Sequence, residues 1–234
     1  MNKNSNSYTI IYAAVMVILV AIGLGFTAQS LKAPQKNNEN IDKMQQILSA
    51  LNIEASQKEA IETYNKVITN AYLVDKDGNI IEGTNGKEVN SPAFVLPLSA
   101  LKKANGYPVF EANINGEVKH IFPMYGAGLW GPLWGYISVD EDNNTIYGAN
   151  FSHQGETPGL GAEITKEQFY SQFPGKKIYQ NGEFKSIAVV KPGKSAAGKD
   201  YVDGISGGTL TSNGVDEMLY ESLKLYDNYL KKKH

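Results

Sequence analysis

The sequence predicts an α+β protein: a single N-terminal membrane helix followed by one domain with a mainly antiparallel sheet flanked by helices. Three observations lead to this prediction. An uncharged apolar run occupies residues 8–28. Short β-prone segments farther along the chain are separated by tight-turn signals, which are typical of hairpins. Amphipathic helical patterns precede and follow those segments. The expected divisions are a cytoplasmic tail (1–7), a transmembrane helix (8–28), a linker (29–40) and an extracytoplasmic domain (41–234).

The apolar run is long enough to cross a bilayer, because 21 residues of helix span about 30 Å. A cleavable signal peptide with Lys3 in its first region is the alternative. The length of the run and the poor cleavage pattern at its end favour a retained anchor. Lys3 favours a cytoplasmic N-terminus, and long domains cross membranes largely regardless of charge. We therefore expect residues 29–234 to lie outside the cytoplasmic membrane of a bacterial cell.

Helical patterns come next along the chain. The polar residues 29–40 include Pro34 and indicate a linker. Apolar residues then recur at helical spacing over 41–52. Ser56 and Glu59 have the capping-box spacing, which predicts a second helix from Ser56 through Ile68.

Four turn signals follow, at Asp77-Gly78, Asn115-Gly116, Asp142-Asn143-Asn144 and Asn181-Gly182. They predict hairpins that pair Tyr72–Val74 with Ile80–Ile81, and Trp134–Val139 with Thr145–Tyr147. The pattern from Val215 to Tyr229 predicts a last amphipathic helix, with Asn213 as its N-cap.

Composition excludes several classes of function. The net charge is −2 and the isoelectric point is near 6.0, which argues against a nucleic-acid partner. All 22 basic residues are lysines, so an anionic ligand depends on amides, hydroxyls and lysine point charges. The chain has no cysteine, which excludes disulfides, thiolate zinc sites and iron–sulfur clusters on it. Three histidines leave little for a transition-metal site, and we expect no metal.

The most informative segment is Asp203–Thr211, which combines an acid, glycines and three hydroxyls just ahead of a helix. Paired glycines let the backbone approach a ligand closely, and consecutive N–H groups near a helix start suit a phosphate. A hydroxyl placed there can contact a phosphate, attack one or be esterified to one. The segment resembles the Asp-x-x-Ser/Thr-Gly-Ala-Thr motif of bacterial proteins that carry FMN as a phosphoester on the last threonine. The resemblance makes Thr209 the attachment residue, with Gly208 in place of the usual alanine.

Three other motif matches compete with that interpretation. Residues 126–131 fit the dinucleotide fingerprint, but Pro132 follows where a helix has to begin. Residues 188–195 resemble a phosphate-binding loop that lacks its first glycine. Residues 204–208 match a nucleophile elbow around Ser206, but only His234 follows it and the expected helix starts late. His153 remains open as a partner in another chain order.

Two further segments support the flavin interpretation. Residues 153–161 contain Glu-Thr-Pro-Gly-Leu-Gly, a tight turn able to present amides and Glu156 to the polar edge of a ring. Residues 128–136 are rich in glycine and contain both tryptophans, and an indole stacks well on a flat conjugated ring. We expect only one tryptophan to reach a flavin, and assign Trp130. The three segments together resemble the NqrC family, a component of the sodium-translocating NADH:quinone oxidoreductases, over nearly the whole chain. RnfG, from the related Rnf electron-transport complex, shares two of the segments and is the alternative.

That resemblance implies an electron-relay subunit whose domain, 41–234, carries covalent FMN received from FAD through a flavin transferase. It implies the remaining subunits of the membrane complex as partners, with membrane lipid around residues 8–28. The residues expected at the flavin are Ser206, Gly207, Gly208, Thr211, Glu156, Thr157, Gly159, Leu160, Trp130 and Lys191. Asp203 is expected to order the loop or to take part in recognition by the transferase. An anchored binding or assembly protein without redox function is the alternative from another class.

Overall fold

The computed structural model describes residues 6–232, so expectations for the first five residues and for His234 lie outside the described part. Its chain divides into two compact units, Met1–Asp42 and Lys43–His234. The first helix, α1 (Asn6–Ser49), begins in one unit and ends in the other. Each unit is described by itself below.

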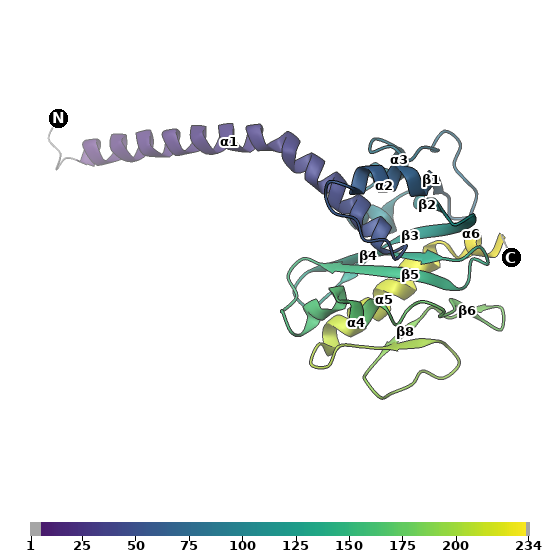
Figure 1. Ribbon diagram of the computed structural model, residues 1–234. Helices are drawn as coiled ribbons and strands as arrows, with labels where there is room; N and C mark the ends of the chain where they lie inside the picture. Colours follow the sequence, from purple (N-terminus) through teal and green to yellow (C-terminus); the bar gives the residue numbers. More distant parts are fainter. Residues whose placement is uncertain (1–5, 233–234) are drawn as a thin grey trace. The chain divides into compact units, whose positions relative to one another are not determined.

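The N-terminal unit consists of the greater part of α1 (Figure 1). Its apolar stretch is long and hydrophobic enough to cross a membrane, and its most apolar window is fully exposed. The segment 29–40, expected as a linker separate from the helices, is instead helical and includes Pro34. Proline removes one backbone donor, and the polar residues around it are compatible with helix. The Lys36–Glu39 pair, 3.3 Å apart at i,i+3 spacing, adds to that helix.

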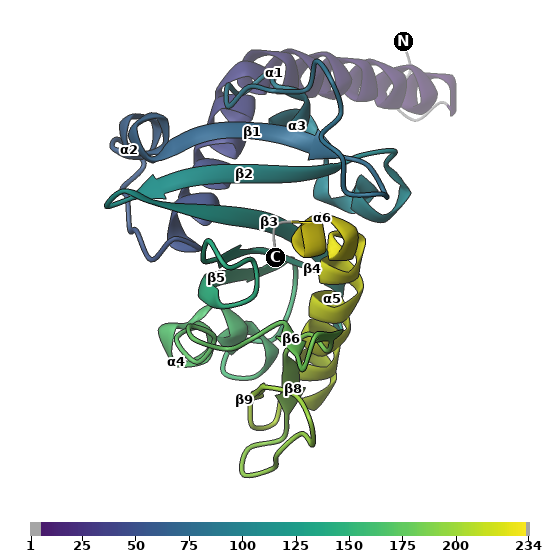
Figure 2. The same cartoon turned by 90° about the vertical axis from the view of Figure 1, so that its right-hand side faces the viewer.

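The second unit is built on a five-stranded antiparallel sheet in sequential strand order (Figures 1 and 2). Its strands are β1 (Ile68–Val74), β2 (Tyr107–Ile114), β3 (Glu117–Ala127), β4 (Pro132–Val139) and β5 (Ile146–His153). The Asn115-Gly116 hairpin is confirmed, with both residues at positive φ as a type I′ turn requires. Trp134–Val139 does pair with the next strand, but its partner is Ile146–Ser152, a longer segment than the predicted Thr145–Tyr147.

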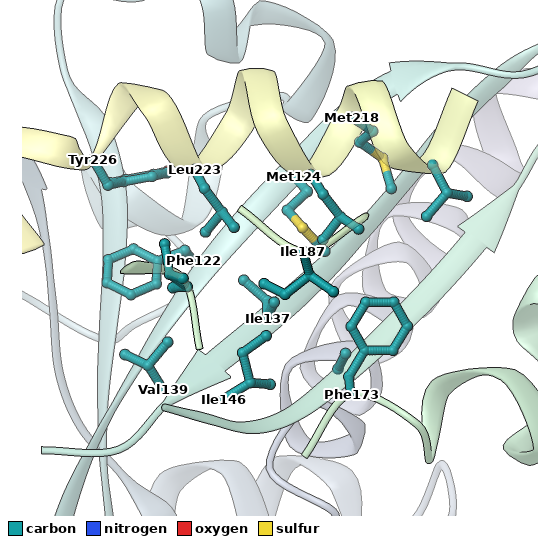
Figure 3. Close-up of a cluster of buried hydrophobic side chains, with 14 of the residues drawn as sticks. Phe122, Met124, Ile137, Val139, Ile146, Phe173, Ile187, Met218, Leu223 and Tyr226 are labelled. Atoms are coloured by element: carbon teal, nitrogen blue, oxygen red, sulfur yellow. The ribbon is translucent and has the colours of Figure 1, made fainter. Parts of the chain in front are cut away.

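Both faces of this sheet are covered. One face packs on the last turns of α1 from Lys43, together with α2 (Ala60–Val67) and α3 (Pro92–Val95). The other face packs on α5 (Thr209–Leu225) and α6 (Asp227–Lys232). Figure 3 shows Met218, Leu223 and Tyr226 of these helices and their connection over Phe122 and Met124 of β3. Alternate residues of each strand point to opposite faces, so both clusters take side chains from the sheet.

The remaining short elements lie outside the five-stranded sheet. They are η1 (Leu98–Lys103), η2 (Gly161–Thr165), α4 (Glu167–Tyr170), β6 (Tyr179–Gln180), β7 (Glu183–Phe184), β8 (Ala188–Val190) and β9 (Tyr201–Asp203). The predicted Asn181-Gly182 turn joins β6 and β7. Strands β8 and β9 form a parallel pair, the exception to the antiparallel pattern in the described chain.

Two predicted element boundaries are wrong near the first strand. Ser56 and Glu59 do hydrogen-bond, at 2.6 Å, but they form a turn and the helix begins only at Ala60. Ile68, expected inside that helix, is the first residue of β1. The expected Tyr72–Val74 hairpin partner, Ile80–Ile81, makes only a single bridge, between Ile80 and Val74 on the edge of β1 opposite to β2. The chain then turns at Glu82–Gly83, which ends this pairing.

The start of α5 is also corrected. The helix begins at Thr209, so Asn213 lies inside it and is not the cap. Asn213 and Gly214 suggest a helix boundary, but tertiary packing overrides that signal. A β-carbon on Gly214 would collide with the carbonyl oxygen of Ala127, so glycine here lets α5 lie close to the end of β3.

Candidate functional site

The Asp203–Thr211 segment connects β9 to α5 and is held at both ends. The Gly204 amide donates to the Val190 carbonyl oxygen at 2.7 Å, which ties the loop to β8. The Ile205 amide donates to Ser212 Oγ at 2.9 Å, which ties it to the helix. Gly207 has φ +77°, a conformation that favours glycine. The loop is therefore a defined turn at the helix N-terminus.

The three hydroxyl side chains of this segment differ in their exposure to solvent. Thr209 is the first residue of α5 and is exposed, as is Ser206. Thr211 is buried. An α-helix leaves its first amides without intrahelical acceptors and carries partial positive charge at this end. The exposed Thr209 hydroxyl thus lies at a helix N-terminus, whose backbone N–H groups and partial positive charge suit an anion such as a phosphate.

A cavity of about 200 Å³ opens beside Thr209. Lys191, which follows β8, lines it together with Ser206, Gly207, Thr209 and Asn213. The structure thus brings Lys191, one of the residues expected at the flavin, to the Asp203–Thr211 loop. The cavity offers a cation, hydroxyls and a helix start, a donor set that fits a phosphate without arginine.

The other two sequence segments meet this loop through one buried carboxylate. Glu156 Oε1 accepts a hydrogen bond from the Trp130 amide at 2.8 Å, and Oε2 accepts one from Thr211 Oγ1. Glu156 is 4% exposed. Residues 128–131, 153–161 and 203–211, far apart in sequence, therefore form one site.

Two exposed apolar side chains, Trp130 and Leu160, belong to the segments that meet the Asp203–Thr211 loop. Trp130 is 67% exposed and Leu160 is 42% exposed. A β-carbon on Gly207 would stand 2.8 Å from Leu160 Cδ2, so Leu160 covers this glycine. Trp134, in contrast, donates from Nε1 to Gln46 Oε1 at 3.0 Å and is partly buried. Of the two tryptophans, Trp130 is the one at the site.

The remaining predicted residues lie at the rim of the site. Thr157 and Gly159 are exposed in the turn before η2, where the Thr157 carbonyl accepts from the Leu160 amide at 3.1 Å. Gly208 lies between Ile205 and the Gly161 amide. The Asp203 side chain is exposed, whereas its backbone is hydrogen-bonded.

Two positioning residues were not found from the sequence. Gln172 accepts from the Asp203 amide at 2.8 Å and donates to its carbonyl at 3.2 Å. Asp216 Oδ1 accepts from the Val189 amide at 2.8 Å and ties α5 to β8. Neither belongs to a motif, and only the tertiary fold brings them to these backbones.

The structure corrects one reason for rejecting the nucleophile elbow. Because α5 begins at Thr209, Ser206 does lie in a strand–turn–helix connection, as an elbow requires. The histidines are engaged elsewhere: His153 Nδ1 accepts from the Glu156 amide at 3.1 Å, and His120 is buried beside Glu111 and Tyr229. The fingerprint-like residues 126–131 connect two strands of a hairpin. Within residues 6–232 no group of three His, Asp or Glu side chains suits a metal.

Comparison with known proteins identifies the family. The FMN-binding domain family matches residues 128–224, a range that contains all three segments of the site. The NqrC component of the Na(+)-translocating NADH-quinone reductase of Vibrio anguillarum is 33% identical over 227 residues, covering 92% of this chain and 89% of that protein. This chain belongs to the NqrC family of Na(+)-translocating NADH-quinone reductase subunits. The corresponding protein of Pasteurella multocida is 35% identical over 92% of this chain and 88% of its own length.

Solved structures of the NqrC family share the fold. The structure from Parabacteroides distasonis has a TM-score of 0.80 and 57% identity, and the match covers 86% of this chain and 96% of that one. The structure of Shewanella oneidensis NqrC has a TM-score of 0.66 at 25% identity, covering 83% and 99%. The predicted α+β fold with an N-terminal apolar helix and an antiparallel sheet domain is confirmed.

Proposed function

We propose that this chain is the electron-carrying NqrC component of a sodium-translocating NADH:quinone reductase, with FMN bound as a phosphoester on Thr209. Family membership and the FMN-binding domain match support the flavin. The observation that carries the attachment site is the exposed Thr209 at the N-terminus of a 17-residue helix, beside a cavity lined by Lys191.

Attachment is a phosphoryl-group transfer from FAD, catalysed by a separate flavin transferase. The Thr209 oxygen forms a bond to the phosphorus on the FMN side of the pyrophosphate. The bond from that phosphorus to the bridging oxygen breaks, AMP leaves with that oxygen, and the hydroxyl proton is released. The protein gains one FMN less one water. Asp203, exposed at the start of the loop, is available to the transferase.

The residues of the chain hold the product by distinct means. Lys191 and the first amides of α5 neutralise the phosphodiester, and Ser206 and the Gly207 amide face the same cavity. Trp130 and Leu160 offer apolar surface to the isoalloxazine ring. Thr157 and Gly159 border that surface in the turn before η2. Gly208 and the buried Thr211 shape the loop from beneath.

FMN, when bound, supplies the redox chemistry, and the chain fixes its position and environment. In the complex, a metal centre in the membrane part is the donor and the next flavin is the acceptor. NADH and quinone bind to other subunits. A covalent tether keeps the cofactor on an exported domain where free flavin is scarce, and it holds the ring at one distance for electron transfer.

We assign α1 as a single-pass anchor in the inner membrane, with residues 29–234 on the periplasmic side. The cysteine-free chain offers a clean test of that orientation. Lys194 is exposed in the loop after β8. A membrane-impermeant maleimide labels Lys194→Cys in spheroplasts if the domain is outside. Labelling only after lysis contradicts the orientation.

The attachment itself is tested by mass and fluorescence on the full chain purified from its native host. The expected result is in-gel flavin fluorescence after denaturation and a mass excess of one FMN less water. Thr209→Ala abolishes both, whereas Thr209→Ser restores the hydroxyl and Ser206→Ala, the matched control in the same loop, retains the adduct. An adduct that survives Thr209→Ala moves the site to Ser206 or Thr211. A chain without flavin favours the non-redox alternative.

A further inference from the structure

The Glu156 carboxylate is buried between the loop 128–131 and the first turn of α5. It is 4% exposed, and each of its oxygens already has a donor from this chain. Oε1 accepts from the Trp130 amide at 2.8 Å, and Oε2 accepts from Thr211 Oγ1. Sequence reasoning placed Glu156 at the polar edge of the ring. Its observed contacts within the chain join the loop 128–131 to the first turn of α5.

Two glycines make room for this carboxylate. A β-carbon on Gly128 would stand 2.5 Å from Oε1, and one on Gly161 would stand 2.5 Å from Oε2. These separations are shorter than any ordinary carbon–oxygen contact, so an alanine at either position displaces the carboxylate. Gly159, in the same turn, has nothing within 4 Å of such a carbon. The clearance is therefore specific to the two glycines that face Glu156.

The turn that carries Glu156 is itself fixed. The Glu156 amide donates to His153 Nδ1 at 3.1 Å, close to where β5 ends. The carboxylate thus extends from an ordered backbone to two other segments. A buried acceptor with two donors is costly to disrupt, because removing it leaves both donors unsatisfied.

The two joined segments carry the two sides of the site. Trp130, whose amide Glu156 binds, has its side chain largely in solvent. Thr211, whose hydroxyl Glu156 binds, lies two residues after Thr209 on the same helical turn. A change in this connection therefore changes the placement of the Trp130 loop relative to the Thr209 hydroxyl.

We propose that Glu156 is a positioning residue that fixes the Trp130 loop against the first turn of α5, and that it acts on the flavin only through this connection. Every atom of the connection belongs to the protein chain. Its consequence for the cofactor rests on the function proposed above: a ring held at Trp130 and a phosphate esterified to Thr209 need a fixed separation between the two.

The test measures amide hydrogen exchange in the full chain without flavin, produced in a host that lacks a flavin transferase. Glu156→Gln preserves the shape but replaces one acceptor oxygen by a donor. The amide exchange rates within 128–131 and 209–212 rise about five-fold or more, which is the factor expected when about 1 kcal/mol of hydrogen bonding is lost. Thr211→Val leaves the carboxylate in place and gives the same pattern. Glu217→Gln, an exposed carboxylate on the same helix, leaves both segments unchanged.

The double variant Glu156→Gln/Thr211→Val shows whether the two residues act through one contact. If they share the contact, the free-energy change in exchange for the double variant is smaller than the sum of the changes for the two single variants. In flavin-loaded protein, Glu156→Gln retains the Thr209 adduct but loses part of the FMN quenching of Trp130 fluorescence. Unchanged exchange in both Glu156→Gln and Thr211→Val overturns the proposal. Failure of Glu156→Gln to fold leaves Thr211→Val to decide it. Absence of FMN from the wild-type protein contradicts the proposed function alone, since exchange is measured without flavin.

Discussion

The main-chain nitrogen of Gly161 lies 3.3 Å from the point where a β-carbon on Gly208 would stand. The start of η2 and the Asp203–Thr211 loop are thus in contact, backbone against backbone. Ile205 Cβ and Cγ2 would lie slightly closer to this carbon, at 3.1 and 3.2 Å, and all three separations are relieved by a shift of a few tenths of an ångström. This explains how alanine, the usual residue of the related motif, and glycine are both compatible with this position.

Gly208→Ala is accordingly expected to fold and to keep FMN on Thr209. Gly207→Ala is the contrasting change, because φ is +77° at Gly207 and Leu160 Cδ2 would lie 2.8 Å from the new carbon. A left-handed conformation costs a non-glycine residue about 1–2 kcal/mol, so Gly207→Ala loses at least that amount of unfolding free energy. Urea unfolding of both variants measures the difference. Equal stability contradicts this account of the loop.

The two tryptophans are expected to report differently on the flavin. Trp130 is 67% exposed at the site, whereas Trp134 is tied to Gln46. FMN attached to Thr209 therefore quenches the fluorescence of Trp130 more strongly than that of Trp134. Trp130→Phe removes most of the flavin-dependent quenching, and Trp134→Phe, the matched control, leaves most of it. Comparison of flavin-bearing and flavin-free protein measures the effect, and the opposite order contradicts the placement of the ring at Trp130.

The fold class and the positions of the Asn-Gly turns can be predicted from the sequence, because these features depend on local chemistry. Asn115 and Asn181 occupy positive φ beside glycine, which few other residue pairs do at low cost. The pairing of Ile80–Ile81 with β1 is shorter than predicted. Ile80 bridges Val74 on the edge of β1 opposite to β2, and the turn at Glu82–Gly83 then ends that pairing.

The three segments of the site were each predicted from the sequence, and the structure adds the contacts through Glu156 that join them. The motifs identify the loop, the tight turn and the exposed tryptophan. The inward direction of Glu156 has no local signal, since a carboxylate in a Pro-Gly turn is usually solvated. The start of α5 at Thr209 has none either, because Gly207, Gly208 and Gly214 all lower helix propensity locally. Packing of Gly214 on Ala127 makes helix possible there.

Alkaline pH is expected to unfold the second unit through a buried tyrosine pair. The hydroxyls of Tyr72 and Tyr229 are 2.6 Å apart, and Tyr72 also donates to Glu111 at 2.7 Å. Burial raises the pKa of Tyr229 to about 12, and burial raises the pKa of Tyr72 as well. Both shifts favour the neutral form in the folded state.

The stabilisation is therefore complete below pH 10, where tyrosine is neutral in both states. It is lost as the pH rises from about 10 towards about 12, because only the unfolded chain releases these protons. Each tyrosine contributes a slope of about 1.4 kcal/mol per pH unit in that range. Tyr229→Phe removes one such group and makes the loss less steep, while costing about 1 kcal/mol at neutral pH. Urea unfolding at pH 8, 10 and 11 measures the slopes; a stability independent of pH above 10 contradicts the prediction.

Gln172 is expected to hold the Asp203–Thr211 loop in place without contributing much to the stability of the folded domain. Its amide group holds both the N–H and the carbonyl of Asp203, at 2.8 and 3.2 Å. Gln172→Ala removes both hydrogen bonds at a partly exposed position, a loss of about 1 kcal/mol each at most. We expect faster amide exchange at Asp203 and Gly204, slower flavin transfer to Thr209, and a nearly unchanged thermal midpoint.

Gln168→Ala is the matched control for that change, because Gln172 contacts only the backbone carbonyl of Gln168. Flavin transfer is measured as the initial rate of fluorescence gain with purified transferase and FAD. A loop that is ordered mainly by Gly204–Val190 pairing shows equal rates in the two variants. A slower rate in Gln172→Ala alone shows that the Gln172 side chain, which follows α4, holds Asp203 at the end of β9 in the position that the transferase recognises.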